Sequence, residues 1–155
     1  MSNVLTRLAT IDDLNKIQNL NNELFKLEKE KYDSTLVSDW PLTEDGKYYF
    51  KNLIENDYVV VALIDDEIVG YLAGTINDKE SYEEIQYGEI NNMLVNSNYR
   101  GYGIGKRLIK SFKTYCKDNN VFHLKVTASF KNTDAIEFYK RNGFEEFDLT
   151  LTTKE

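Results

Sequence analysis

Two apolar runs in the middle of the chain constrain the fold most, because together they predict a hairpin of strands. Residues 57–64 (DYVVVALI) form a continuous, β-branched apolar run that is typical of a buried strand. Asp65 and Asp66 then predict a tight turn, and residues 67–76 predict the returning strand. A hairpin this apolar needs other elements to cover it, so the flanking segments decide the fold class.

The flanking segments alternate between helical and strand patterns. Apolar residues repeat at spacings of three and four after Thr10, a candidate N-cap, and predict a helix that ends near Lys31. Further helices are expected over 44–56, 103–118 and 132–141, and further strands over 4–8, 84–95, 122–128 and 147–151. The order βααβββαβαβ predicts an α/β fold of three layers around a mixed sheet. The 155 residues suit a single domain, 1–155.

Composition excludes several classes of protein. One Cys and one His exclude a disulfide scaffold and argue against a structural metal site, so we expect no metal. No apolar run approaches the ~18 residues that span a membrane, and residues 1–4 lack the basic and apolar regions of a secretory signal. The net charge of −7 argues against binding to nucleic acid or to a membrane surface. We therefore expect a cytoplasmic protein.

One short segment is cationic within this anionic chain. Between residues 100 and 117 there is no acid, and the basic residues are Arg100, Lys106, Arg107, Lys110, Lys113 and Lys117. The segment opens with a glycine loop, residues 100–106 (RGYGIGK), that joins a predicted strand to a predicted helix. Backbone N–H groups in such a loop, together with the helix N-terminus, suit a phosphate or pyrophosphate. The alternative is a tight turn whose glycines serve only its geometry.

The loop does not match the common nucleotide-binding patterns. A Walker A loop needs glycine where Arg100 stands and Ser or Thr where Arg107 stands. The dinucleotide pattern needs a third glycine at Lys106, and it is expected earlier in a chain. A nucleotide-binding domain is therefore disfavoured.

The loop and a second motif resemble the GNAT superfamily of N-acetyltransferases. Arg100-x-x-Gly103-x-Gly105 is similar to that family's pyrophosphate loop, and residues 90–95 resemble its central strand. Residues 132–144 (NTDAIEFYKRNGF) are similar to its C-terminal motif, so the resemblance covers nearly the whole chain. It implies a mostly antiparallel sheet with a splayed central strand. It also implies transfer of an acetyl group from acetyl-coenzyme A to a primary amine, by direct attack in a ternary complex.

The resemblance also implies roles for particular residues. Tyr139 corresponds to the acid that protonates the coenzyme A sulfur, and Glu89 to a general base. Glu84, Tyr87 or water could replace Glu89 as the base, and Tyr139 could instead be a core aromatic. The expected cofactor-binding residues are Met93, Leu94, Val95, Arg100, Gly101, Tyr102, Gly103, Ile104, Gly105, Lys106 and Asn132. We expect His123 to be structural and Cys116 to lie in the core.

The acceptor is expected to be a cationic amine, either a small molecule or a peptide. In the family, the first two helices and the loop after residue 76 shape the acceptor site, and here these segments are acidic and aromatic. The residues concerned are Glu28, Glu30, Tyr32, Asp33, Asp39, Trp40, Glu44, Tyr48, Tyr49 and Tyr82. Acids and aromatic faces both attract cations. The alternative function is a non-catalytic sensor or interaction module that binds acetyl-coenzyme A, and the chain could be a monomer or a homodimer.

Overall fold

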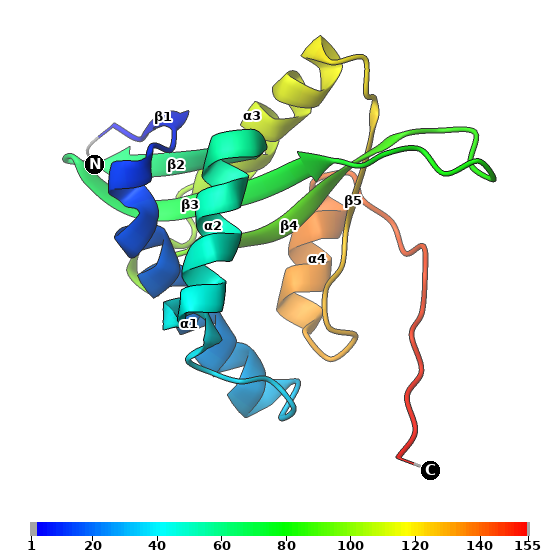
Figure 1. The fold of residues 1–155 in the computed structure, drawn as a ribbon, viewed down its shortest axis with the longest axis horizontal. Coiled ribbons are helices and arrows are strands. Elements are labelled where there is room, and N and C mark those ends of the chain that lie inside the picture. The colour runs from blue at the N-terminus through cyan, green and yellow to red at the C-terminus, as the bar shows by residue number, and fades with distance from the viewer. Residues whose placement is uncertain (1–2, 155) are drawn as a thin grey trace.

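The computed structural model describes residues 3–154 and is built around one five-stranded sheet (Figure 1). Its strands follow the chain order β1-β2-β3-β4-β5 across the sheet. They are β1 (Leu5–Leu8), β2 (Tyr58–Ile64), β3 (Glu67–Ile76), β4 (Tyr87–Val95) and β5 (His123–Val126). Met1 and Ser2, part of the segment judged for a secretory signal, and Glu155 lie outside the described residues.

Helices cover both faces of the sheet and make the three predicted layers (Figure 1). On one face lie α1 (Leu14–Lys31) and α2 (Glu44–Asn56), and on the other lie α3 (Ile104–Asp118) and α4 (Thr133–Arg141). Short 3₁₀ turns precede or connect helices at η1 (Ile11–Asp13), η2 (Trp40–Leu42) and η3 (Ser97–Tyr99). No helix within residues 3–154 is both long and apolar enough to cross a membrane.

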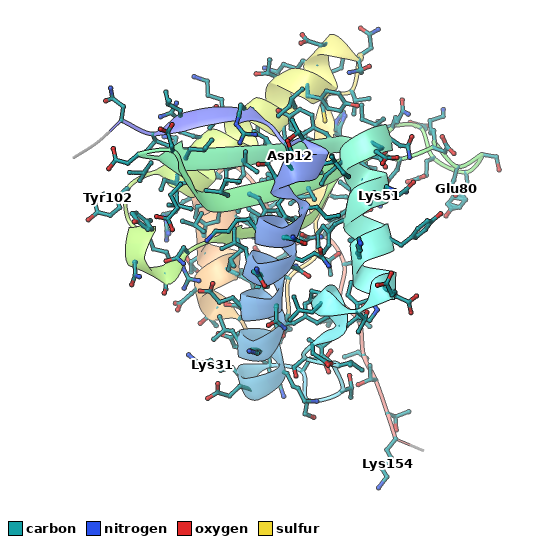
Figure 2. The ribbon with its side chains drawn as sticks, turned by 60° about the vertical axis from the view of Figure 1, so that its left-hand side comes forward. Asp12, Lys31, Lys51, Glu80, Tyr102 and Lys154 are labelled. Atoms are coloured by element: carbon teal, nitrogen blue, oxygen red, sulfur yellow. The ribbon has the colours of Figure 1, made fainter. Side chains whose placement is uncertain are left out.

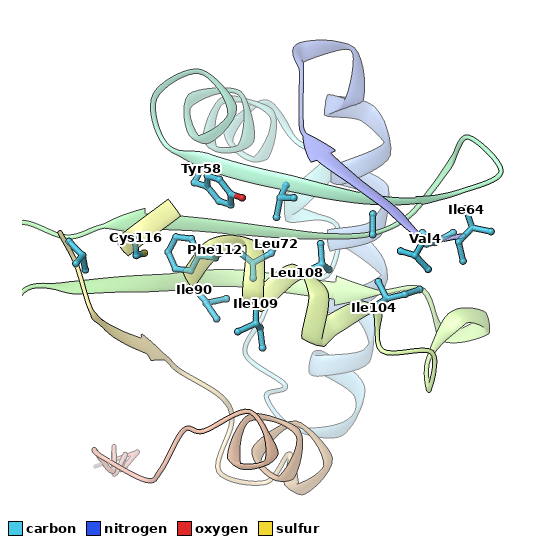
Figure 3. Close-up of a cluster of buried hydrophobic side chains, with 14 residues drawn as sticks. Val4, Tyr58, Ile64, Leu72, Ile90, Ile104, Leu108, Ile109, Phe112 and Cys116 are labelled. Atoms are coloured by element: carbon cyan, nitrogen blue, oxygen red, sulfur yellow. The ribbon is translucent and has the colours of Figure 1, made fainter. Parts of the chain in front are cut away.

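Each face of the sheet buries its own hydrophobic cluster. Figure 3 shows the cluster on the α3 side, where Leu72 and Ile90 of the sheet meet Leu108 and Phe112 of the helix. On the opposite side, Ile17 and Phe50 of α1 and α2 are fully buried against the sheet. The strands of the central hairpin are therefore covered on both faces, which is why their sequences are apolar at nearly every position.

The sheet splits on one side of β4. β1 to β4 pair antiparallel, whereas β5 pairs parallel to β4 and only over Tyr87–Ile90. The register between β3 and β4 shifts after Ile90, so Asn91 is an extra residue that bulges out of the ladder. Beyond this bulge β4 continues to Val95 with β3 as its partner, while β5 ends at Val126. The prediction of a mixed, mostly antiparallel sheet with a splayed central strand is confirmed.

The predicted elements form, with shifts of a few residues at their ends, except for the last strand. The strand predicted over 147–151 is wrong, because this segment is extended but pairs with no strand within residues 3–154. A strand needs a partner for its backbone groups, and Phe147, Leu149 and Leu151 are 75%, 62% and 83% exposed. The strand predicted over 122–128 is shorter than expected, since β4 turns away from it at the bulge.

Candidate active site

The centre of the candidate site is the gap that opens between β4 and β5 beyond their last paired residues, Ile90 and Val126. We call this gap the wedge. The amide of Asn96 donates to the carbonyl of Val69, at a distance of 2.8 Å, on the β3 side. Successive residues of a strand direct their N–H groups to opposite edges, so the amides of Met93 and Val95 face the opposite, open edge. Because β5 has ended, these two amides are available to a ligand, whereas the Leu94 side chain is buried in the α1 side.

The glycine loop follows directly from this open edge. The side chain of Arg100 turns back, and its Nε donates to the Val95 carbonyl at 3.1 Å. Gly101 and Gly103 have φ angles of +86° and +78°, a conformation that favours glycine. A Cβ at either position would meet no atom within 4 Å, so the loop surface is open to an approaching group. The N-terminus of α3 begins at Ile104, and its exposed N–H groups and the cationic helix favour an anion.

The remaining loop residues have different surroundings. Tyr102 projects outward from the loop, as Figure 2 shows, and Lys106 is exposed at the start of α3. Ile104 is buried in the α3-side cluster. A Cβ at Gly105 would lie 2.8 Å from the ring of Phe138, so this glycine permits α3 to pack against α4. Gly105 therefore has a packing role that the motif alone did not reveal.

Tyr139 lies on α4 and reaches the wedge from the α3 side. Its ring packs edge-on against Phe138 and Phe144, 5.3 Å and 5.6 Å between ring centres. Burial, and secondly the charge of Glu28, raise the pKa of Tyr139 to about 12. Glu28 lies on α1, so its charge acts on the phenol from the opposite helix layer. The hydroxyl takes part in no hydrogen bond found within residues 3–154.

Asn132 precedes α4 and caps its N-terminus. Its Oδ1 accepts a hydrogen bond from the amide of Ala135 at 3.1 Å. The side chain is half-buried, so its amide NH₂ group can still donate to a ligand while the oxygen caps the helix.

Glu89 lies on β4, two residues before the bulge, and faces the α2 side of the sheet. Its Oε1 accepts a hydrogen bond from Nδ2 of Asn77 at 2.8 Å. Its charge contributes to the raised pKa of Tyr49, after the larger effect of burial, so the carboxylate lies near that phenol. Glu84 is exposed in the loop before β4. The ring centres of Tyr87 and His123 are 6.2 Å apart, where β4 and β5 are still paired. Of the candidate bases, Glu89 is the one nearest to the bulge.

Comparison with known proteins identifies the fold and the family. The model of the acetyltransferase (GNAT) family matches residues 14–144, which is most of the chain. The chain belongs to the acetyltransferase (GNAT) family. The match contains the wedge, the glycine loop, Glu89 and Tyr139, so the predicted family is confirmed.

The GNAT relatives match most of this chain, but the match covers different shares of the relatives' own lengths. An uncharacterised N-acetyltransferase of Methanocaldococcus jannaschii is 33% identical over 67% of this chain. The matched part spans about half (47%) of the length of that protein. A putative ribosomal protein bS18-alanine N-acetyltransferase of Bacillus subtilis is 29% identical over 72% of this chain and 68% of its own. The aminoglycoside acetyltransferase AAC(6')-Iy, solved with a bisubstrate analogue, has the same fold, with a TM-score of 0.77, 16% identity and 99% of each chain covered.

Two asparagines of this GNAT chain were missed as site residues. Asn91 and Asn92 interrupt an apolar strand, and the bulge places both on the α2 side of β4. The Nδ2 of Asn91 donates to Thr75 Oγ1 at 3.4 Å, and that of Asn92 to the Tyr49 hydroxyl at 3.5 Å. The Oδ1 of Asn92 is buried and has no partner among the described residues. A polar pair inside a buried strand was the available signal, since such groups need partners.

Aromatic side chains form a row beside Asn92 on the α1–α2 side. Phe25 stacks on Trp40, Trp40 meets Tyr49 edge-on, and their ring centres are 5.8 Å and 5.6 Å apart. Next to them is an open, apolar hollow of about 310 Å³ between α1 and the segment before η2. Of the aromatic residues predicted to shape an acceptor site, Trp40 and Tyr49 belong to this row, whereas Tyr48 is exposed on α2.

An acidic hollow of about 330 Å³ lies beyond Glu89, at the β3–β4 loop. Its lining residues are Asn77, Asp78, Glu80, Tyr82, Glu83, Tyr87 and Lys125. Asn77 connects this hollow to Glu89 through their hydrogen bond. His123 is exposed at the start of β5, whereas Cys116 is fully buried, as predicted, and burial raises its pKa to about 11. Within residues 3–154 no group of three or more His, Cys, Asp or Glu could hold a metal ion.

Proposed function

We propose that this protein transfers an acetyl group from acetyl-coenzyme A to a primary amine. The observation that carries the proposal is the open edge of β4, which leads without interruption into a glycine loop and a cationic helix. The unpaired amides of β4 are followed directly by a loop that suits an anion. This arrangement suits an extended ligand that carries a thioester at one end and a pyrophosphate at the other. Acetyl-coenzyme A has this form.

In this arrangement the amides of Met93 and Val95 would bind the pantetheine arm and the thioester carbonyl. A carbonyl that gains negative charge during attack is stabilised by an N–H aimed at it. The amides from Gly101 to Lys106 would bind the pyrophosphate, and the Asn132 amide would contact the arm from α4. Leu94 would hold the strand in place from the opposite side of the sheet, where its side chain is buried.

The proposed reaction forms a C–N bond and breaks a C–S bond. A neutral amine nitrogen attacks the thioester carbon, and its proton passes to Glu89 directly or through water. The sulfur leaves as a thiol with a proton from the Tyr139 hydroxyl, which solvent then restores. Because the pKa of Tyr139 is about 12, the phenol is protonated and can donate throughout the neutral range. Glu89 would be the base because it is a half-exposed carboxylate on the acceptor face of β4.

The acceptor is proposed to be a cationic amine with an apolar or planar part. The Trp40 and Tyr49 rings offer cation–π contact, and the unpartnered Oδ1 of Asn92 can accept a hydrogen bond from an amine N–H. The names of the solved structure and of the Bacillus subtilis relative suggest an aminoglycoside and a protein alanine as classes to test. Both small-molecule and peptide amines therefore belong in the acceptor screen.

The test is release of free thiol from acetyl-coenzyme A with a panel of amines. We expect thiol release with at least one cationic amine, together with binding of coenzyme A in calorimetry. Binding of acetyl-coenzyme A without thiol release from any amine would instead support the non-catalytic sensor or interaction module. No binding of coenzyme A would overturn both.

A further inference from the structure

The side chain of Glu28 lies on the sheet-facing side of α1. Ile17, Asn21 and Leu24 precede it at spacings of four and three, so all four share one face of the helix. Ile17 is fully buried, and Leu24 packs against the hydrophobic cluster between α1 and the sheet. Asn21 donates a hydrogen bond to the Tyr71 hydroxyl at 2.8 Å. Glu28 is half-buried at the end of this face, and Figure 1 shows that end of α1 extending beyond β4, as α4 does.

The carboxylate of Glu28 has no partner in the part of the chain that the structure describes. It takes part in no hydrogen bond or ion pair found within residues 3–154. The neighbouring cation, Lys29, instead donates to the carbonyls of Ser34 and Leu36, at 2.8 Å and 2.6 Å. Burial, and secondly the charge of Asp33, raise the pKa of Glu28, so its ionised form is stabilised less than in water. A carboxylate in this condition favours an added cation.

The surroundings of Glu28 place this carboxylate between the reacting groups and an apolar surface. Its charge raises the pKa of Tyr139, the proposed acid, from the opposite helix layer. Phe25, three residues earlier on α1, lines the apolar hollow together with Trp40. Residues three apart on a helix have Cβ atoms about 5–6 Å apart, so the carboxylate and the hollow are neighbours. A ligand with an ammonium group at Glu28 can therefore place an apolar group in the hollow.

We propose that Glu28 binds the ammonium group of the acceptor and holds it beside Tyr139, with the apolar part of the acceptor in the hollow next to Phe25. This inference rests on the proposed function, because it concerns the acceptor of that reaction. The acceptor binds in its protonated form, and its proton then passes to Glu89 or water before the nitrogen attacks. Glu28 is thus a specificity residue, which favours amines over neutral molecules of the same shape, and Glu89 remains the base.

The first test measures binding and does not need turnover. Its probes are phenethylamine, which carries an ammonium group at neutral pH, and phenethyl alcohol, which has the same apolar part and a neutral hydroxyl. We expect the unaltered chain, saturated with coenzyme A, to bind the amine at least about tenfold more tightly than the alcohol in NMR titrations, because a charged pair makes the stronger hydrogen bond. Glu28→Gln should bind both with nearly equal affinity, since Gln keeps the shape but not the charge.

Glu23→Gln is the matched control for this test. Glu23 lies on the same helix and is exposed, so the variant removes one carboxylate from α1 away from the site. It should keep the preference for the amine. Glu28→Gln should leave thermal unfolding unchanged, because the carboxylate has no partner to lose among the described residues.

A second test uses the amine that gives the most thiol release in the acceptor screen. Glu28→Gln should raise the KM of this amine about tenfold or more and leave kcat and the KM of acetyl-coenzyme A within about twofold, the pattern for lost binding that substrate and transition state share. Glu89→Gln should instead lower kcat. Steady-state kinetics therefore distinguish the two acids.

Four results would overturn the proposal. These are equal binding of amine and alcohol by the unaltered chain, a preference that Glu28→Gln keeps, a preference that Glu23→Gln also loses, and a lower kcat with unchanged KM in Glu28→Gln. Failure of the proposed function is distinct from all four, because it shows as no binding of coenzyme A or no thiol release with any amine.

Discussion

Single residues at the wedge carry the proposed chemistry, and each has a conservative substitution that retains its contacts. Tyr139 and Glu28 are 111 positions apart in the chain, yet the charge of one raises the pKa of the other. Glu89 keeps a neutral hydrogen-bond partner in Asn77, and Tyr139 keeps two aromatic neighbours. Substitutions that preserve these contacts therefore test the chemistry separately from stability.

Tyr139→Phe should lower kcat by roughly 10²-fold, the usual scale for a lost general acid. The ring and its packing remain, so the affinity for acetyl-coenzyme A should change little. Because the pKa of Tyr139 is about 12, the pH dependence of kcat below pH ~10 should keep its shape in the variant. Steady-state kinetics between pH 6 and 10 measure this. An unchanged kcat would make Tyr139 a packing residue.

Glu89→Gln should also lower kcat by roughly 10²-fold, because the amide cannot take a proton from the acceptor. The Gln side-chain oxygen can still accept the hydrogen bond from Asn77, so thermal stability and acetyl-coenzyme A binding should hold. Glu84→Gln is the matched control in an exposed loop and should be close to neutral. Full activity in Glu89→Gln would assign the proton transfer to water or to another group.

At the scale of the element, the strand–loop–helix unit from β4 to α3 is the proposed binding device. The bulge at Asn91 turns β4 away from β5, and this opens the edge that carries the Met93 and Val95 amides. The loop then reverses through Gly101 and Gly103, and α3 begins at once. Affinity for the coenzyme should depend on this unit more than on Tyr139 or Glu89.

Gly103→Asp should weaken coenzyme A binding by about tenfold or more, measured by calorimetry. The carboxylate would stand in the open space where the pyrophosphate is proposed to bind, and the two charges repel. Gly103→Asn is the control, since Asn also adopts positive φ but carries no charge. Equal affinities for the two variants would show that the anion does not bind at this loop.

At the scale of the whole molecule, an ion pair ties the sheet edge to the first helix. Arg7 of β1 makes two hydrogen bonds to the Asp13 carboxylate, at 2.7 Å and 3.1 Å, and the Thr10 amide donates to it at 2.8 Å. The pKa of Asp13 lies below its usual value, mainly because Arg7 donates hydrogen bonds to the carboxylate. Burial opposes this shift, and the hydrogen bond from the Thr10 amide adds to it. Folding is therefore favoured when Asp13 is ionised.

Asp13→Asn should lower the free energy of unfolding by about 1–2 kcal/mol at pH 7. Asp13 has a lower pKa in the folded chain, so its contribution is complete above its unfolded pKa of about 3.9 and is lost as pH falls through the folded pKa. Urea unfolding at pH 7 and near pH 3 measures this difference, which should shrink at the lower pH. A gap of equal size at both pH values would show that the charge is not the cause.

The sequence by itself determined the hairpin, the helices and the glycine loop, because these depend on local patterns. Apolar runs, Thr10 as a candidate N-cap, and the glycines of the loop act over a few residues, so they could be interpreted without knowing the fold. The glycine-loop motif and the motif of residues 132–144 were recognised only by resemblance to a family. The role of Gly105 in packing against Phe138 required the structure.

Only the tertiary structure decided which segments meet. The bulge at Asn91, the open edge of β4, and the approach of Glu28 to Tyr139 depend on register and layer packing, which no local pattern specifies. The same reason explains the wrong strand at 147–151. Its alternation was correctly identified, but a strand exists only where a neighbouring edge accepts its backbone groups, and this segment has no such edge in the part of the chain that the structure describes.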